Sequence, residues 1–432
     1  MSSSSRFRTG THAHRIESTG WGWELAGRGA RKDQEGGRAR DVIEVASKHL
    51  NTMGVSVEWF SAIADELKIS RPALYNFAVD RGDLLFKCYA HACDVFDAAL
   101  AQALSSSVAS AEILEAFLTI TAAPGQRETA VMSELDALPQ DARALIVARR
   151  DGIAAQLEAV IEQGVRNGAF RPVDTRIVSH AVLGMASWAP IYRRWTTSRL
   201  APGALGVKEL LFRGLAADPN APFDKLAGPV RAEPSRIDPF DREALNAARQ
   251  EAILAAAASL FNRKGIGATR VEDVGAAVGL SKRAIFHHIG QKDALVDACV
   301  ARSNRLNLGV MDAAENLPVS RLEATYAAVR DVIDAARDPD QSILVLHVGF
   351  GLLSPAGRRA ATRDSRLLAE GYRRILRQGQ AEGSIRDLPV NETVASLPAV
   401  FSWAVRSSAP SLGDRAHVAD ELATLTVRGI LA

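Results

Sequence analysis

The sequence has few of the residues that cross-links and membrane spans require. Three cysteines in 432 residues are too few for a disulfide framework, which suits a reducing compartment. No apolar run reaches the roughly eighteen residues of a membrane helix, and the first ten residues, MSSSSRFRTG, lack the apolar core of a secretory signal. We therefore expect a cytoplasmic protein with no membrane partner.

Aromatic residues are also scarce, at 6% of the chain, and β-branched residues rarely occur in runs. Alanine- and leucine-rich segments with helical spacing dominate, so the sequence predicts an all-α protein. Hydrophobic content is 47% and charged content 24%, which is ordinary for a chain of roughly two to four globular domains. The net charge of +2 does not by itself indicate a nucleic-acid partner, so that evidence must come from local clusters.

The segment 271–295 predicts two short helices joined by a tight turn. Val271, Val274 and Val278 share one apolar face at helical spacing. Gly279 ends the first helix, because glycine turns the chain without steric cost, and Ser281 stands where an N-cap belongs. Such a pair is a helix-turn-helix, whose second helix can enter a DNA major groove.

Residues 265–295 resemble the DNA-binding domain of the TetR family of bacterial transcriptional regulators. The resemblance is carried by an ordered set: Gly265, Thr269, Val274, Gly279, Leu280, Ser281, Ile285, Phe286, His288, Ile289, Lys292, Asp293 and Leu295. A single helix-turn-helix match is a weak signal, whereas this ordered set is a strong one.

The same stretch occurs twice. A shift of 211 (265 − 54) aligns the pairs Gly54/Gly265, Ile63/Val274, Ile69/Leu280, Ser70/Ser281, Tyr75/Phe286, Arg81/Lys292, Leu84/Leu295 and Cys88/Cys299. Further on, residues 161–171 (IEQGVRNGAFR) match residues 376–386 (LRQGQAEGSIR) at a shift of 215 (379 − 164), which also brings Trp403 onto Trp188. This period is too long for a solenoid and indicates that a whole unit is duplicated.

The duplication predicts two tandem TetR-like units, the first repeat (38–215) and the second repeat (241–432). We expect the following segments: a disordered tail (1–37), a first helix-turn-helix domain (38–88), a first helical body (89–215), a proline-rich linker (216–240), a second helix-turn-helix domain (241–300) and a second helical body (301–432). The alternative for the tail is a basic arm that contacts DNA phosphates. The resemblance implies that each body holds a small-molecule pocket and the helices that pair two units.

One group of candidate residues would position the protein on DNA. We expect Thr269 to start its helix, where its hydroxyl can meet a phosphate. Arg81 and Lys292 occupy the position at which the family commonly contacts a phosphate. Tyr75 keeps the family's hydroxyl, and Phe286 lacks it.

A second group would read bases from the two recognition helices. It consists of Arg71 and Asn76 in the first repeat and Lys282, Arg283 and His287 in the second. Arg and Lys suit guanine, and Asn suits adenine; the alternative is ordinary surface charge. Ser70 and Ser281 begin these helices, and Pro72 is tolerated in a first turn, where its missing N–H would lack a partner anyway.

The first helix-turn-helix domain departs more from the family. Ala78 replaces a bulky aromatic residue, Gly82 replaces an acid, and Glu58 replaces the usual capping Thr. These departures leave open how strongly the first domain binds DNA.

An aromatic stripe in the first body is a candidate ligand contact: Trp188, Tyr192 and Trp195 are spaced at i, i+4 and i+7. The alternative is packing within or between the units. Seven arginines between 358 and 377 read as a basic solvated face. We expect no cofactor and no metal, since His287 and His288 are adjacent and point about 100° apart on a helix.

The sequence therefore favours a sequence-specific DNA-binding regulator, a repressor released by a small-molecule effector, with double-stranded operator DNA as its partner. One alternative is a ligand- or partner-binding helical protein in which one DNA-binding domain has degenerated. An all-α enzyme is a weaker one, since no phosphate loop or nucleophile–base motif is present. The two repeats should pair within one chain as a pseudo-dimer through the helices around Trp188 and Trp403, and a further homodimer stays open.

Overall fold

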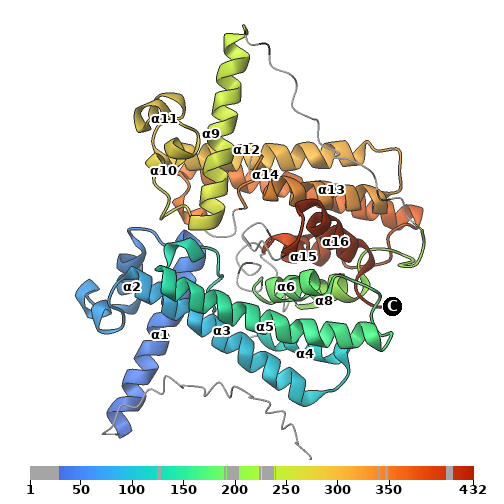
Figure 1. The fold of residues 1–432 in the computed structure, drawn as a ribbon, viewed down its shortest axis with the longest axis horizontal. Coiled ribbons are helices and arrows are strands. Elements are labelled where there is room, and N and C mark those ends of the chain that lie inside the picture. The colour runs from blue at the N-terminus through green and yellow to red at the C-terminus, as the bar shows by residue number, and fades with distance from the viewer. Residues whose placement is uncertain are drawn as a thin grey trace, which may run out of the picture. The chain divides into compact units, whose positions relative to one another are not determined.

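The computed structural model describes residues 29–123, 128–188, 191, 204–222, 225, 238, 240–338, 341–345, 349–404 and 412–432, with only the backbone of 29–36 and 204–205. Most of the predicted tail and linker lies outside these residues, as do Tyr192 and Trp195. The described part is almost entirely helical, and it contains two isolated β-bridges but no β-strand (Figure 1). The predicted all-α class is confirmed. No helix among the described residues has the length and apolar character to cross a membrane.

The first repeat begins with α1 (Gly29–Met53), α2 (Trp59–Leu67), the 3-10 helix η1 (Arg71–Asn76) and α3 (Arg81–Ser106). Helix α1 begins before Arg38, so the expected disordered tail is too long at its C-terminal end. The predicted apolar face of this helix is buried: Val42, Ala46 and Leu50.

The second repeat begins in the same order, with α9 (Arg242–Lys264), α10 (Val271–Ala277), α11 (Lys282–His288) and α12 (Lys292–Glu315). Asp241 caps α9 by accepting hydrogen bonds from two backbone N–H groups of its first turn. The predicted apolar face of α9 is also buried: Ile253, Ala257, Leu260 and Phe261.

Each body continues with helices in matching positions. In the first body these are α4 (Ser110–Thr121), η2 (Leu135–Ala137), α5 (Gln140–Arg166), α6 (Thr175–Ala186) and α8 (Ala204–Arg213). In the second they are α13 (Arg321–Arg337), η3 (Phe350–Leu352), α14 (Pro355–Glu382), α15 (Val390–Phe401) and α16 (Arg415–Arg428). The equivalence that the sequence shift indicates therefore extends to the order of elements.

A buried asparagine in each repeat holds the segment that follows α4 or α13. Asn51 donates to the Thr129 carbonyl (2.9 Å) and accepts from the Val131 N–H (2.8 Å). Asn262 bonds in the same way to segment 343–345 (2.8 and 3.1 Å). Both clasps satisfy buried backbone groups that no helix pairs, and they tie each body to its own helix-turn-helix domain.

The repeated motif at 161–171 and 376–386 has a packing cause. A Cβ on Gly164 would lie within 3.0 Å of the Phe170 ring, and one on Gly379 within 3.0 Å of Ile385. Both glycines are therefore required, because the chain folds back and packs an apolar side chain directly on the helix that precedes it.

The last residue of this motif bonds to the other repeat, and it does so reciprocally in the two repeats. Arg171 Nε donates to the Gly429 carbonyl (2.7 Å), and Arg386 Nε donates to the Gly214 carbonyl (2.8 Å). These residues are equivalent at the shift of 215 (386 − 171, 429 − 214). Gly214 and Gly429 also meet each other: a Cβ on either would lie within 3.0 Å of the other's backbone nitrogen.

The late helices of the two repeats pack together, α6 and α8 against α15 and α16 (Figure 1). Trp188 Nε1 donates to the Ala395 carbonyl (3.2 Å), and a Cβ on Gly184 would lie within 3.0 Å of the Trp403 ring. The Trp403 ring also lies 5.7 Å from that of His180, which is equivalent to Ala395 (395 − 180 = 215). The two tryptophans that the sequence shift aligns thus each contact the opposite repeat.

The turn of the first helix-turn-helix domain contains the only non-glycine residue with a positive φ among the described residues, Lys68 (φ 55°). Its equivalent is Gly279 (279 − 68 = 211; φ 69°). Because a side chain costs about 1 kcal/mol in this conformation, Lys68→Gly should raise the free energy of unfolding by about that amount. Gly279→Lys should lower it similarly, since open space surrounds a Cβ there. Urea unfolding followed by circular dichroism tests both, and unchanged midpoints would contradict the assignment of the cost to the backbone.

Gly214→Ala should destabilise the protein by about 2–5 kcal/mol, because it combines a strained φ of 61° with a clash against Gly429. Gly168→Ala is the matched control. Its φ is 74° and nothing lies within 4 Å of a Cβ, so it should cost only the backbone term of about 1–2 kcal/mol. Equal losses in the two variants, measured by urea unfolding, would show that the contact between the two glycines does not matter.

Candidate nucleic-acid interface

The second helix-turn-helix domain has the predicted local geometry. Helix α10 ends at Ala277, Gly279 turns the chain, and the Ser281 hydroxyl accepts from the Ala284 N–H (3.2 Å) to cap α11. Ile285 is fully buried and anchors α11 on its domain core. The predicted reading residues Lys282, Arg283 and His287 are on the exposed side of the helix, as the helical period requires.

The exposed side chains of α11 differ in how far they are engaged. Lys282 forms an ion pair with Glu272 (2.6 Å) and lies 5.6 Å from the centre of the Phe286 ring. The hydrogen bond from Lys282 lowers the pKa of the Glu272 carboxyl. Arg283 makes no hydrogen bond or ion pair with any residue that the structure describes. Of the two cations, Arg283 can therefore meet a base without first breaking an ion pair.

Two predicted phosphate contacts of this domain are directed into the protein. Thr269 is buried, and its hydroxyl donates to the Gly265 carbonyl (2.7 Å), because α10 starts at Val271 and not at Thr269 as expected. Lys292 Nζ donates to the Gly267 carbonyl (3.0 Å). Burial lowers the pKa of the Lys292 ammonium, and nearby carboxylates, including Glu134, oppose that shift. A phosphate would have to replace these internal partners.

The recognition element of the first domain has fewer residues per turn than an α-helix. Residues Arg71–Asn76 form a 3-10 helix in which Pro72 lies in the first turn and Ser70 supplies no side-chain cap, unlike Ser281. The Phe77 N–H donates a hydrogen bond to the Leu74 carbonyl three residues earlier (2.9 Å), which is the hydrogen-bond spacing of a 3-10 helix. The recognition helix expected from Ser70 is therefore present as a 3-10 helix that Ser70 precedes.

The predicted side chains of this element nevertheless face solvent. Arg71 and Asn76 are exposed, and Tyr75 is 53% exposed with its ring edge-on to Phe60 (5.8 Å). Arg81 Nη1 lies 3.5 Å from the Ser56 carbonyl, which matches the bond from Lys292 to Gly267 (267 − 56 = 211).

The three family departures in the first domain have structural counterparts. Ala78 is buried, so a small side chain fills the position of the usual aromatic. Glu58 stands at the N-cap of α2 without a side-chain capping bond. A Cβ on Gly82 would lie 3.3 Å from both Asp80 and Pro139, so this position is crowded.

The equivalent cysteines are packed inside the two domains. Cys88 points its thiol at the Ile43 carbonyl and Cys299 points its thiol at the equivalent Leu254 carbonyl (3.9 and 3.5 Å). Burial raises the pKa of both thiols to about 12. A thiol in this state is a poor nucleophile, so these cysteines are packing residues of the two domain cores.

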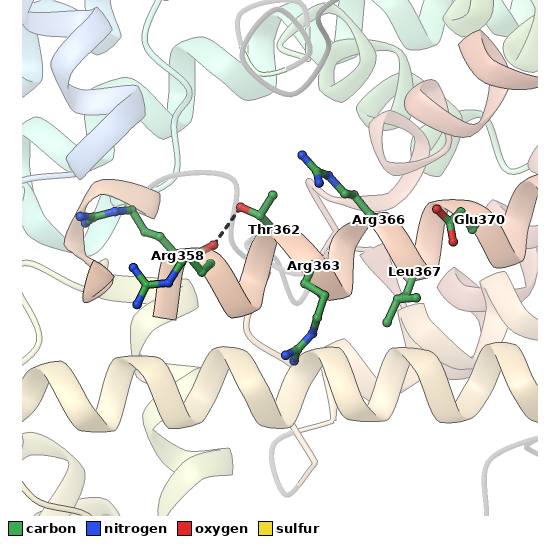
Figure 2. A pocket seen from close by; sticks show the side chains of 7 residues that line it. Arg358, Thr362, Arg363, Arg366, Leu367 and Glu370 are labelled. Atoms are coloured by element: carbon green, nitrogen blue, oxygen red, sulfur yellow. Dashed lines mark hydrogen bonds between the residues drawn. The ribbon is translucent and has the colours of Figure 1, made fainter. Parts of the chain in front are cut away.

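A cavity of about 510 Å³ lies over α14 in the second body (Figure 2). Its described lining comes from this one helix: Arg358, Arg359, Thr362, Arg363, Arg366, Leu367 and Glu370. Figure 2 shows the arginines projecting in different directions from the helix, with no point on which they converge. The surface therefore corresponds to the basic solvated face that the sequence indicates.

The predicted aromatic stripe is described only at Trp188. This side chain is buried and its Nε1 donates to a carbonyl of the other repeat, which favours packing over ligand contact.

A residue that the sequence did not single out lies between the two helix-turn-helix domains. Glu134 is a carboxylate with 3% exposure, and its Oε2 accepts from the Val55 N–H (2.6 Å). Nothing in the local sequence ELDALP marks it as functional. Its counterpart is Gly349, since Glu134 precedes η2 and Gly349 precedes η3 at a shift of 215 (349 − 134). A difference between the repeats at this position was therefore the one available signal.

Two family models match the chain, in different repeats. The model described as "Bacterial regulatory proteins, tetR family" matches residues 253–299, and "Tetracyclin repressor-like, C-terminal domain" matches residues 111–195. No curated protein matches the chain.

Several solved structures are similar to part of the chain. They include the TetR family transcriptional regulator PfmR from Thermus thermophilus (27% identity, 41% of this chain and 97% of that one, TM-score 0.35). AibR in complex with isovaleryl coenzyme A and operator DNA is another (24%, 40% and 97%, 0.34). A transcriptional regulator of the TetR/AcrR family from Thermobifida fusca is a third (26%, 41% and 96%, 0.30).

The matched segments fall on the structural elements that the family resemblance predicts. Residues 253–299 run from α9 through the Ser281-capped α11 into α12, and residues 111–195 include α4, α5 and α6 of the first body. One segment in each repeat therefore matches a domain model of the TetR family.

Proposed function

We propose that the protein is a sequence-specific DNA-binding transcriptional repressor that a small molecule releases from its operator. The observation that carries the proposal is the capped helix α11 inside the matched segment 253–299, which presents Arg283 and His287 to solvent. An Arg side chain on such a helix suits the two acceptors of guanine in the major groove.

We further propose that the two repeats of one chain pair as the two subunits of a TetR dimer do. The support is the reciprocity of the contacts between the repeats: Arg171 to Gly429 and Arg386 to Gly214. Such an exchange, in which residue i contacts j and the equivalent of j contacts that of i, is the pattern of a two-fold interface. Two reading domains suit an operator whose half-sites lie about one helical turn, roughly 34–36 Å, apart.

The two reading domains carry different side chains, so the operator should be asymmetric or an imperfect palindrome. Arg71 and Asn76 face solvent in the first domain, where Lys282, Arg283 and His287 do so in the second. Asn suits adenine and Arg suits guanine, so each domain favours its own half-site.

Release by an effector would work as a population shift. A ligand that binds more tightly to a form whose reading domains are wrongly spaced for DNA lowers operator affinity. By linkage, operator DNA must weaken ligand binding by the same factor. The effector site is proposed for the helical bodies, on the family resemblance.

A duplex selected from a random DNA pool tests the architecture. One chain should protect two dissimilar half-sites in footprinting, and light scattering should give the mass of one chain, or of two on a longer operator. The covalent linker favours pairing within the chain because it maintains a high effective concentration. A homodimer that uses one reading domain per chain on a perfect palindrome would refute the pseudo-dimer.

Arg283→Ala should weaken binding to the selected duplex by about 1–3 kcal/mol and relax sequence preference in one half-site only. Arg166→Ala, an exposed arginine on α5 of the body, serves as the control and should leave affinity unchanged. Fluorescence anisotropy at fixed salt measures both. Equal affinities for the two variants would mean that α11 does not read DNA.

A further inference from the structure

The loops that follow the first helix of the two helix-turn-helix domains meet each other. Residues 54–56 follow α1 and residues 265–267 follow α9. A Cβ on Gly267 would lie within 3.0 Å of the Val55 carbonyl oxygen. We call residues 54–56, Glu134 and residues 265–267 the head junction. It joins the two DNA-binding domains directly, at the base of each.

Glu134 lies at the centre of the head junction. Its Oε2 accepts from the Val55 N–H (2.6 Å). A Cβ on Gly54 or on Gly265 would lie within 3.0 Å of its Oε1, and these two glycines are equivalent in the repeats. The carboxylate therefore fills space that only glycine leaves free, on both loops at once. With 3% exposure it is shielded from water, so its contacts are not weakened by competing solvent.

Each loop is also bonded to its own domain by the cation that begins the next long helix. Lys292 donates to the Gly267 carbonyl (3.0 Å), and Arg81 Nη1 lies 3.5 Å from the Ser56 carbonyl. Burial lowers the pKa of the Lys292 ammonium, and the Glu134 carboxylate is one of the nearby charges that oppose this shift. A shift of either loop is thus passed to the helix that follows the recognition element.

Glu134 itself is held by the first body. Its N–H donates to the buried Tyr89 hydroxyl (3.1 Å), and its segment is clasped by Asn51 through Val131 (2.8 Å). These bonds fix the carboxylate relative to α1 and α3. The carboxylate is therefore held in place by the first repeat, and the second DNA-binding domain packs against it.

The head junction is one-sided. Gly54 matches Gly265 in the repeats, and Arg81 matches Lys292. Gly267 instead matches Ser56, and the counterpart of Glu134 is Gly349, which has no carboxylate. One carboxylate therefore contacts both domains. The two-fold relation that the late helices show does not hold at the head junction.

We propose that Glu134 fixes the distance between the two reading domains and thereby determines which operator half-site spacing the protein accepts. Successive base pairs are about 3.4 Å apart along each strand, so a displacement of one domain by that amount corresponds to one base pair. The second half of this inference rests on the proposed DNA-binding function, whereas the first half concerns the protein alone.

The distance is tested without DNA, by spin labels at equivalent exposed positions, Asp65→Cys on α2 and Ala276→Cys on α10 (276 − 65 = 211). The native cysteines are buried, which protects them from the label. The parent should give a narrow distance distribution in double electron–electron resonance. Glu134→Ala should shift or broaden it by at least one base-pair rise, about 3.4 Å. The control Glu162→Ala, on the exposed face of α5, should not change it.

If Glu134→Ala does not fold, as loss of its helical circular dichroism signal would show, a second variant tests the same distance. Gly267→Ala places a methyl group against the Val55 carbonyl from the opposite side of the junction, so it should lengthen the distance with Glu134 intact. A parental distribution in every variant that folds would overturn the inference.

The spacing is tested with the selected duplex carrying one or two base pairs inserted or removed between its half-sites. The parent should lose at least tenfold in affinity per base pair, and Glu134→Ala less than threefold. If Glu134→Ala changes the distance but keeps the parental spacing profile, its role in half-site spacing is refuted. If the labels respond but the parent binds no duplex, the proposed DNA-binding function fails while the role of Glu134 in the domain distance stands.

Discussion

The close approach of two backbones at Gly214 and Gly429 is the constraint on which the rest of the arrangement depends. Neither position has room for a Cβ, and both have a positive φ. With the backbones in contact, Arg171 and Arg386 can each reach a carbonyl of the opposite repeat. The same approach brings the apolar faces of α6 and α8 onto α15 and α16. Burial of apolar area between these helices supplies the free energy of the contact between the repeats. The two glycines allow the close approach that this burial requires.

The sequence predicted features whose causes are local. The turn at Gly279, the cap at Ser281 and the buried faces of the first helices depend on residues a few positions apart, and all three were right. It failed at Thr269 and Glu134 for different reasons. The Thr269 hydroxyl bonds to the Gly265 carbonyl four residues before it, because α10 starts at Val271 and not at Thr269. The position of Glu134 depends on loops about 80 and 130 residues away (134 − 55 = 79, 265 − 134 = 131), and contacts so distant leave no periodic signal in the chain.

Because the two repeats belong to one chain, nothing requires that both be the same. In a dimer of identical chains every substitution appears twice, so a carboxylate such as Glu134 would face its own copy across the axis. Here the counterpart of Glu134 is Gly349, and the first recognition element is a 3-10 helix where the second is a capped α-helix.

The position of the contact residues in the chain also has a consequence for synthesis. Leu215 and Ala216 bond to the Val427 carbonyl (2.9 and 2.7 Å), so the first repeat is covered only when the ribosome has added more than 200 further residues (427 − 216 = 211). At about 5–20 residues per second, this takes roughly 10–40 s. During that interval the apolar faces of α6 and α8 have no partner of their own chain. Neighbouring nascent chains on one messenger can then compete for the faces that the second repeat will cover.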